Sequence, residues 1–145
     1  MPVTEEISRG ELLAGRYRVG PRIGSGGMAT VFLAEDEVLG REVAVKRVHT
    51  DGSAADAGRL RREARLGASL AHPNMVMIFD TVTADDGVFI VMEHVDGRPL
   101  SELIGDGMAS ERLLPILEAI ASALDYAHRN GVVHRDVKPA NVLIA

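Results

Sequence analysis

The stretch VVHRDVKPANVLIA, residues 132–145, contains the eight residues HRDVKPAN that decide how the rest of the chain is interpreted. Asp136, Lys138 and Asn141 bring a carboxylate, an ammonium group and a carboxamide within a few positions of one another. A carboxylate can accept a proton, a lysine can hold an anion, and a carboxamide oxygen suits a hard cation such as Mg²⁺. Apolar residues flank this polar run on both sides, which predicts a loop between two short strands.

The composition is that of an ordinary globular protein and excludes several classes. The chain is 46% hydrophobic and 26% charged, with a net charge of -5 and no cysteine. Disulfides and thiolate metal sites are therefore excluded, and no basic stripe indicates a nucleic-acid partner. No apolar run approaches the roughly 20 residues of a membrane span, and no signal peptide is visible. We expect a cytoplasmic protein without a membrane segment in this chain.

Hydrophobic periodicity and turn residues predict strands first and helices later. The expected elements are strands at 17–24, 29–36 and 42–48 in an antiparallel meander, a helix at 57–70, a hairpin over 75–95, a short helix at 100–104 and a long helix at 110–130. The hairpin turns at Asp85-Asp86-Gly87, and Ser110 is a plausible N-cap of the long helix. Leu113, Leu117, Ile120 and Leu124 form its expected apolar stripe.

A glycine-rich turn, GSGGMATV (residues 24–31), lies between the first two strands. Such a turn can point backbone N–H groups at an anion, but a plain glycine-rich hairpin is an equal alternative. Lys46 favours the anion, because strand alternation places it on one face with Ala44. Its counter-charge would be Glu63, unless Glu63 forms a surface ion pair with Arg59 at i−4.

Lysine is rare in this chain, which makes its positions informative. Of the 16 basic residues only Lys46 and Lys138 are lysines. A lysine is a compact point charge and an arginine is a planar fork, so the two are not equivalent at a phosphate.

Taken in order, these motifs resemble those of a eukaryotic-like protein kinase, most closely the bacterial serine/threonine kinases. The motifs are the glycine turn with Val31, Ala44-Val45-Lys46, Glu63, His72-Pro73-Asn74, and HRDVKPAN. The resemblance implies an α+β fold: a small lobe of antiparallel sheet with one helix, followed by the first helices and the catalytic loop of a large helical lobe. The expected division is a flexible leader at 1–15, a small lobe at 16–96 and an incomplete large lobe at 97–145.

The resemblance also implies a site for ATP and Mg²⁺. Asp136 would accept the proton of a protein serine or threonine hydroxyl, Lys138 would stabilise the transferring phosphoryl group, and Asn141 would bind Mg²⁺. Lys46 would hold the α- and β-phosphates and pair with Glu63. The other nucleotide-binding residues implied are Ile23, Gly24, Ser25, Gly26, Gly27, Val31, Ala44, Met92, Glu93, Val95 and Leu143, of which Val31, Ala44 and Leu143 would sandwich the adenine.

This sequence departs from the family after Asn141, because no aspartate follows to supply the second Mg²⁺ ligand. We therefore expect these 145 residues alone to be inactive, as part of a serine/threonine kinase. Two alternatives remain: a catalytically inactive nucleotide-binding or regulatory module, and an interaction protein that pairs with a kinase. Dimerisation through the small lobe is an expectation on family grounds only.

Overall fold

In the computed structural model of the chain, residues 10–25, 29–48, 54–84, 87–132 and 138–145 are described. They form two compact units. The first contains the chain up to Ser69 together with Met77–His94, and the second contains Leu70–Val76 together with Val95–Ala145. The change of unit after His94 lies near the expected lobe boundary at 96. The inclusion of Leu70–Val76 in the second unit was not indicated by the sequence.

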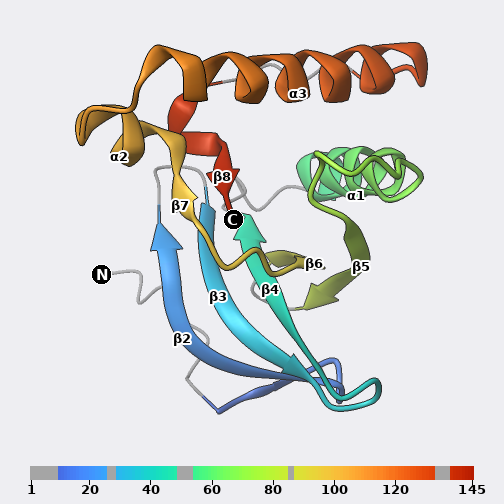
Figure 1. Ribbon diagram of the computed structural model, residues 1–145. Helices are drawn as coiled ribbons and strands as arrows, with labels where there is room; N and C mark the ends of the chain where they lie inside the picture. The colour runs from blue at the N-terminus through green and yellow to red at the C-terminus, as the bar shows by residue number, and fades with distance from the viewer. Residues whose placement is uncertain (1–9, 26–28, 49–53, 85–86, 133–137) are drawn as a thin grey trace, which may run out of the picture. The chain divides into compact units, whose positions relative to one another are not determined.

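The first unit is built on a six-stranded antiparallel sheet in the order β1-β2-β3-β4-β6-β5. Its strands are β1 (Leu12–Leu13), β2 (Tyr17–Ser25), β3 (Ala29–Asp36), β4 (Arg41–Val48), β5 (Ile78–Ala84) and β6 (Gly87–Glu93). The expected meander and hairpin are both confirmed. Strand β1 is a difference: it pairs with β2 inside the range expected as a leader. The strands β2 and β3 are strongly curved (Figure 1).

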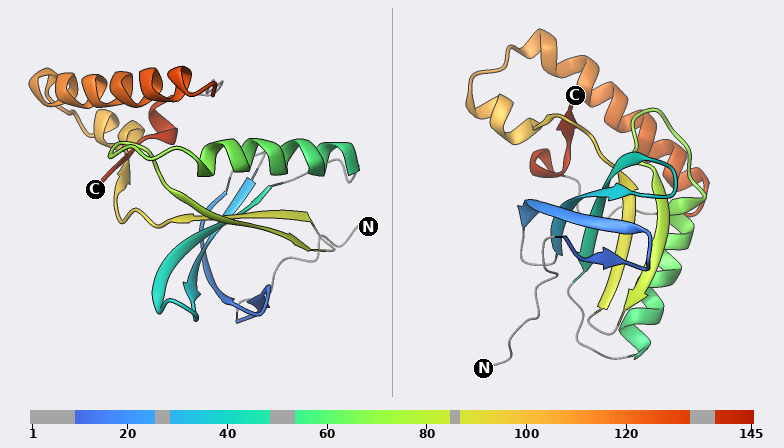
Figure 2. Two further views of the ribbon diagram at one scale, coloured as in Figure 1. Left: turned by 90° about the vertical axis from the view of Figure 1, so that its right-hand side faces the viewer. Right: turned by 90° about the horizontal axis from the view of Figure 1, so that it is seen from below.

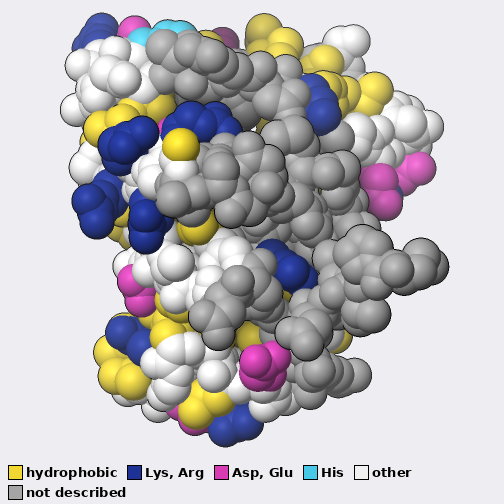
Figure 3. Space-filling view, turned by 180° about the vertical axis from the view of Figure 1, so that it is seen from behind, with side chains coloured by type: hydrophobic (Ala, Val, Ile, Leu, Met, Phe, Trp, Pro, Cys, Tyr) yellow, Lys and Arg dark blue, Asp and Glu magenta, His cyan; other side chains and the backbone are white. Residues whose placement is uncertain are grey.

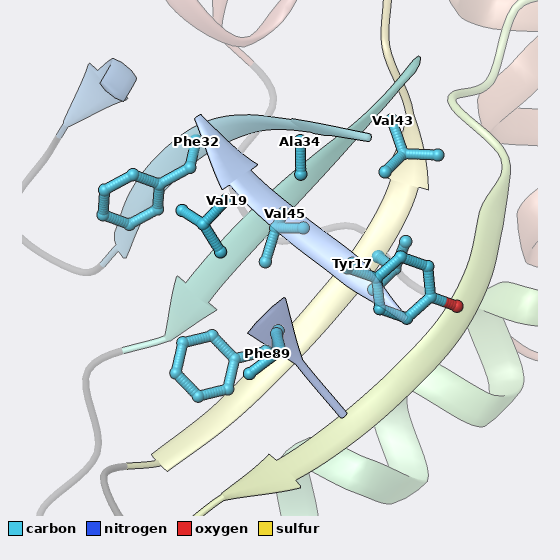
Figure 4. Close-up of a cluster of buried hydrophobic side chains, with 9 residues drawn as sticks. Tyr17, Val19, Phe32, Ala34, Val43, Val45 and Phe89 are labelled. Carbon is cyan, nitrogen blue, oxygen red and sulfur yellow. The ribbon is translucent and has the colours of Figure 1, made fainter. Parts of the chain in front are cut away.

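One face of this curved sheet carries the hydrophobic core. Alternation along the strands places the buried side chains on the same side, as Figure 4 shows. The cluster consists of Leu13, Tyr17, Val19, Phe32, Ala34, Val43, Val45, Phe89 and Val91. The residues between them, such as Lys46 and Met92, therefore lie on the opposite face.

Helix α1 (Ala54–Ala68) runs alongside β5 and β6 (Figure 2). It begins before the expected residue 57, because the small residues Ala54 and Ala55 are good helix formers and join its first turn. Ala64 is buried, and Gly67 lies so close to β5 that an added Cβ would be 2.7 Å from Ile78 Cδ1. The helix therefore packs on the sheet through Ala64 and Gly67, whereas Ala68 is exposed.

Two polar contacts join residues of the first unit that are far apart in the sequence. Asp36 is fully buried at the end of β3, and its two carboxylate oxygens each accept a 2.8 Å hydrogen bond from the Arg16 guanidinium. The Tyr17 hydroxyl donates to Asp80 Oδ2 at 2.7 Å. Burial, followed by this hydrogen bond to Asp80, raises the pKa of Tyr17 to about 12.

The second unit contains β7 (Arg98–Pro99), α2 (Leu100–Gly105), α3 (Ser110–Arg129), the 3₁₀ turn η1 (Pro139–Asn141) and β8 (Leu143–Ile144). The prediction of Ser110 as N-cap is wrong. The capping position is Ala109, which has no side chain to accept a hydrogen bond, and Ser110 is already helical. Of the predicted apolar stripe, Leu117 is exposed, and the other three residues, Leu113, Ile120 and Leu124, are half-buried. The buried residues of α3 are Ala123 and Ala127, which the stripe did not include. No helix in the described ranges is long and apolar enough to cross a membrane.

Candidate active site

Three residues of the candidate site form a row across neighbouring strands. Gly24 on β2 is paired with Val31 on β3, and Val31 is paired with Lys46 on β4. Because adjacent strands are about 4.8 Å apart, the Lys46 backbone lies roughly 10 Å from the glycine that opens the turn. The strand register therefore aligns Gly24, at the start of the turn, with Lys46, whereas residues 26–28 of the turn lie outside the described residues.

The surroundings of Lys46 on this face are apolar. Ala44 is opposite Met92 in the β4–β6 pairing, and Lys46 is opposite Ile90. Ala44 is buried, and Val31, Lys46 and Met92 are half-buried. Around Lys46 this face is an apolar surface next to a cation, in contrast to the fully buried core face.

The glycine turn itself is described only at its two ends. Strand β2 continues to Ser25, which pairs with Thr30 at the start of β3. A Cβ added at Gly24 would meet nothing closer than Val31 Cβ at 4.0 Å, so the backbone is uncrowded there. Ile23 beside it is 47% exposed. The predicted phosphate-contacting residues Gly26 and Gly27 lie outside the described residues.

Glu63 does not pair with Lys46 in this structure. Its carboxylate Oε1 lies 3.6 Å from Arg59 Nη1, and its side chain is 61% exposed. The i,i+4 spacing holds these two groups on the same outward face of α1, which favours the surface pair over the predicted one. The sequence left both pairings open, and the structure has the Arg59 pair.

Glu93 and Val95, two of the nucleotide-binding residues that the resemblance implies, belong to different units. Glu93 ends β6, and its amide N–H donates to Met77 O at 2.8 Å. Its side chain also accepts from the Met77 N–H at 3.2 Å. The Glu93 N–H is therefore engaged within the sheet, so a ligand could use only the carbonyl of this residue. Val95 is the first residue of the second unit after the change at His94.

The segment after residue 137 is held by a small sheet and a 3₁₀ turn. Lys138 precedes η1 in an extended conformation, and its carbonyl accepts from the Asn141 N–H at 2.9 Å. Strand β8 pairs with β7, and the Leu100 N–H donates to Val142 O at 2.7 Å. Lys138 and Asn141 are both exposed, and Leu143 is 44% exposed.

Glycine is required at position 97 for this arrangement. A Cβ there would clash with the carbonyl oxygen of Ile144, which no side chain could accommodate without moving the backbone. Sequence reasoning placed Asp96–Pro99 as a break and missed β7. The signal that could have identified it is the Gly97–Pro99 pattern ahead of a helix, which suits a short edge strand.

The remaining catalytic expectations fall partly outside the described residues. Asp136, with His134 and Arg135, lies in 133–137. Among the residues that the structure describes, no group of three or more His, Cys, Asp or Glu side chains is placed to hold a metal ion. Asn141 is thus the single predicted Mg²⁺ ligand within the described ranges, and it does not form a metal site by itself.

Bacterial serine/threonine-protein kinases are similar to this chain in sequence. PrkC of Bacillus subtilis, a serine/threonine-protein kinase, is 46% identical over 139 residues, which cover 93% of this chain and 22% of PrkC. PknB of Mycobacterium leprae, also a serine/threonine-protein kinase, is 42% identical over 142 residues, covering 92% of this chain and 23% of PknB. This chain therefore spans about a fifth of the length of these two kinases.

A solved structure and a family model extend the comparison. The crystal structure of the Mycobacterium tuberculosis PknI kinase domain matches with a TM-score of 0.83 and 31% identity, over 95% of this chain and 58% of that one. The model of the protein kinase domain matches residues 17–145. The kinase fold expected from the motifs is thereby confirmed, and the chain belongs to the protein kinase domain family.

Proposed function

We propose that this chain forms the nucleotide-binding and catalytic-loop part of an enzyme that transfers the γ-phosphoryl group of ATP to serine or threonine in proteins. The observation that carries the proposal is the row of Gly24, Val31 and Lys46 across three strands. It brings a backbone able to approach phosphates and the chain's one strand lysine to the same face of the sheet.

The described side chains fit a nucleotide. Val31, Ala44 and Met92 offer an apolar surface of the kind that an aromatic base needs, and Lys46 offers a cation on the same face. A lysine with no carboxylate partner among the described residues has its ammonium group available for a phosphate. Bound there, ATP would be held through its base by apolar contact and through its phosphates by charge.

The residues of HRDVKPAN would carry out the transfer. Asp136 would orient the attacking hydroxyl and accept its proton, and Lys138 would offset the charge on the transferring group. Mg²⁺, when bound, neutralises phosphate charge in this chemistry, and Asn141 is the residue of this segment that would contribute an oxygen to it. We propose likewise that the substrates of the whole enzyme are proteins with an accessible serine or threonine.

The test is phosphoryl transfer by the full-length protein. We expect Mg²⁺-dependent transfer from radiolabelled ATP to a generic protein substrate, with the label recovered as phosphoserine or phosphothreonine. A matched substrate with all serine and threonine replaced by alanine should receive none. Full-length protein that binds ATP and still transfers nothing would refute the kinase proposal and support a nucleotide-binding module.

The 145 residues alone should behave differently. With one Mg²⁺ ligand predicted in them, we expect this piece to bind nucleotide weakly and to show no transfer above background. Robust turnover by the isolated piece would contradict the need for a second metal ligand.

A further inference from the structure

The outer face of α1 has an excess of positive charge. The helix carries four arginines, Arg59, Arg61, Arg62 and Arg65, against two acidic residues, Asp56 and Glu63. Glu63 is already paired with Arg59. Figure 3 shows Lys and Arg side chains gathered over this helix. On a chain with a net charge of -5, this is a local basic surface that favours an anion.

One hydroxyl lies against this basic surface. Thr83 is exposed on β5, and its Oγ1 accepts a long, 3.5 Å hydrogen bond from Arg61 Nη1. A neutral hydroxyl at this distance contributes little, and it is the one hydrogen-bond partner that the described part of the chain gives the Arg61 guanidinium, which has five N–H donors. The contact nevertheless places Thr83 Oγ1 within reach of a cation on the neighbouring helix.

The position of Thr83 in the sheet makes it accessible to an enzyme. Strand β5 is at the edge of the sheet, with β6 as its one neighbour. Thr83 is the next-to-last residue of the strand, and only the pairs Thr83–Val88 and Ala84–Gly87 lie between it and the hairpin turn. Opening these two terminal pairs would present Thr83 in an extended segment, at a small cost compared with unfolding the sheet.

We propose that Thr83 is a phosphorylation site and that Arg61 holds the resulting phosphate, fastening α1 to β5. An ATP-dependent protein kinase would supply the group: the bond from the γ-phosphorus to its bridging oxygen breaks, a bond to Thr83 Oγ1 forms, and the hydroxyl proton leaves. The new oxygens extend beyond Oγ1 toward the guanidinium. Charge-assisted bonds of about 2.8 Å then replace the long neutral contact.

The consequence for the molecule lies in α1. This helix packs on β5 and β6 through its small residues Ala64 and Gly67. A charged contact at the middle of the helix would add a second point of attachment to the one at Gly67 and Ile78. Because Glu63 is on the same helix, the phosphate would restrict where that carboxylate can lie. The restriction of Glu63 matters only if the proposed function holds, whereas the phosphorylation of Thr83 does not depend on that function.

The experiment has two parts, both on the full-length protein. First, the protein is isolated from its source cells in exponential and stationary growth, and phosphopeptides containing Thr83 are measured by mass spectrometry. Second, protein with phosphothreonine encoded at position 83 is compared with unmodified protein by hydrogen exchange of α1 and β5. The same comparison is made in Arg61→Gln and in Arg62→Gln, where Arg62 is the adjacent arginine without a hydrogen bond to β5 among the described contacts.

We expect phosphate at Thr83 in cells, and exchange in α1 and β5 slowed about fivefold or more by the phosphate. The slowing should persist in Arg62→Gln and disappear in Arg61→Gln. The absence of phosphate at Thr83 in both growth phases would overturn the proposal. Equal slowing in Arg61→Gln would overturn the role of Arg61. If an acidic protein that co-purifies with the unmodified chain slowed hydrogen exchange in α1, the arginines of this helix would be a docking surface for that protein. This outcome would overturn the proposal that they serve a phosphate on Thr83.

Discussion

Tyr17 on β2 and Asp80 on β5 are joined by a 2.7 Å hydrogen bond, although three strands separate β2 from β5 in the sheet order. The bond is possible because the sheet curves, and Figure 4 shows the hydroxyl directed toward β5. The Tyr17 ring is 2% exposed and forms part of the core, while its oxygen satisfies the carboxylate beyond it. A single side chain thus contributes both to packing and to closing the curved sheet.

Tyr17→Phe should lower the free energy of unfolding by about 1–2 kcal/mol, because it keeps the ring and removes the only side-chain donor shown for Asp80 Oδ2. Urea unfolding at pH 7 measures this. Asp80→Asn, which retains an acceptor, is the matched control and should cost less. An equal loss in both variants would mean that the negative charge of Asp80, and not the hydrogen bond, matters.

Tyr17 also predicts an alkaline limit to stability. Its pKa is raised to about 12 from 10.0 by burial and then by Asp80, so the folded state holds the phenolic proton more tightly than the unfolded state does. This contribution is fully present below pH 10 and is lost as pH rises toward 12. The stability difference between the native protein and Tyr17→Phe should therefore shrink between pH 10 and 12. A constant difference across that interval would contradict the assignment.

Asp36 predicts the opposite limit. The Arg16 guanidinium, helped by the Leu39 and Val38 N–H groups, holds the pKa of Asp36 well below its usual 3.8 against the opposing effect of burial. A lowered pKa stabilises the fold above pH 4, and the contribution is lost as pH falls below that value. Asp36→Asn should lower the urea midpoint at pH 7, and the difference in midpoint between the native protein and this variant should be smaller at pH 3. An equally large difference at pH 3 would mean that the charge of the Asp36 carboxylate does not cause the stabilisation.

The sequence predicted the sheet well because its strands carry clear local signals. The range 29–36 was expected as a strand and is β3, and the pairing of β5 with β6 confirms the hairpin expected over 75–95, whose residues 85 and 86 lie outside the described residues. The Arg16–Asp36 and Tyr17–Asp80 contacts were not predicted, because their partners are 20 and 63 residues apart. Sequence periodicity assigns a residue to a face but does not say which distant residue it meets.

The candidate site was predictable to a similar degree. Strand alternation was enough to place Ala44 and Lys46 on one face, and the register confirms it. The partner of Glu63 was not decidable from the sequence, because an i,i+4 arginine and a distant lysine compete for the same carboxylate. Strand β8 was expected from the apolar residues that follow Asn141, whereas its partner β7 was missed because a two-residue strand is too short to show any period.

Lys46→Met in the full-length protein should reduce phosphoryl transfer by about 10²–10³-fold, the range typical for removing one charge-stabilising group. The fold should remain intact, since Lys46 forms no ion pair with a described residue and methionine suits its apolar neighbours. Transfer from radiolabelled ATP and a urea midpoint measure the two effects. Arg129→Met on α3 removes the same charge from an exposed ion pair and should leave transfer unchanged. Near-normal transfer by Lys46→Met would remove Lys46 from the site.

The hydrogen bonds of the His72 ring determine which of its two nitrogens carries the proton. Its Nδ1 accepts a hydrogen bond from the Asn74 N–H at 3.0 Å, so Nδ1 carries no proton. The proton must then be on Nε2, which lies 3.1 Å from Ser122 Oγ on α3 and can donate to it. This bond and the one from the Ala71 N–H to the Tyr126 hydroxyl fasten residues 70–76 to the long helix.

¹⁵N chemical shifts of the His72 ring at pH 8 should therefore show the Nε2–H form in large excess. His72→Ala should destabilise the second unit by about 1 kcal/mol, because it removes both hydrogen bonds of the ring. Ser122→Ala should have a smaller effect and should keep the Nε2–H form in excess, because the Asn74 N–H still donates to Nδ1. A ring that is Nδ1–H in the native protein would contradict the contact with Asn74 and the attachment of this turn to α3.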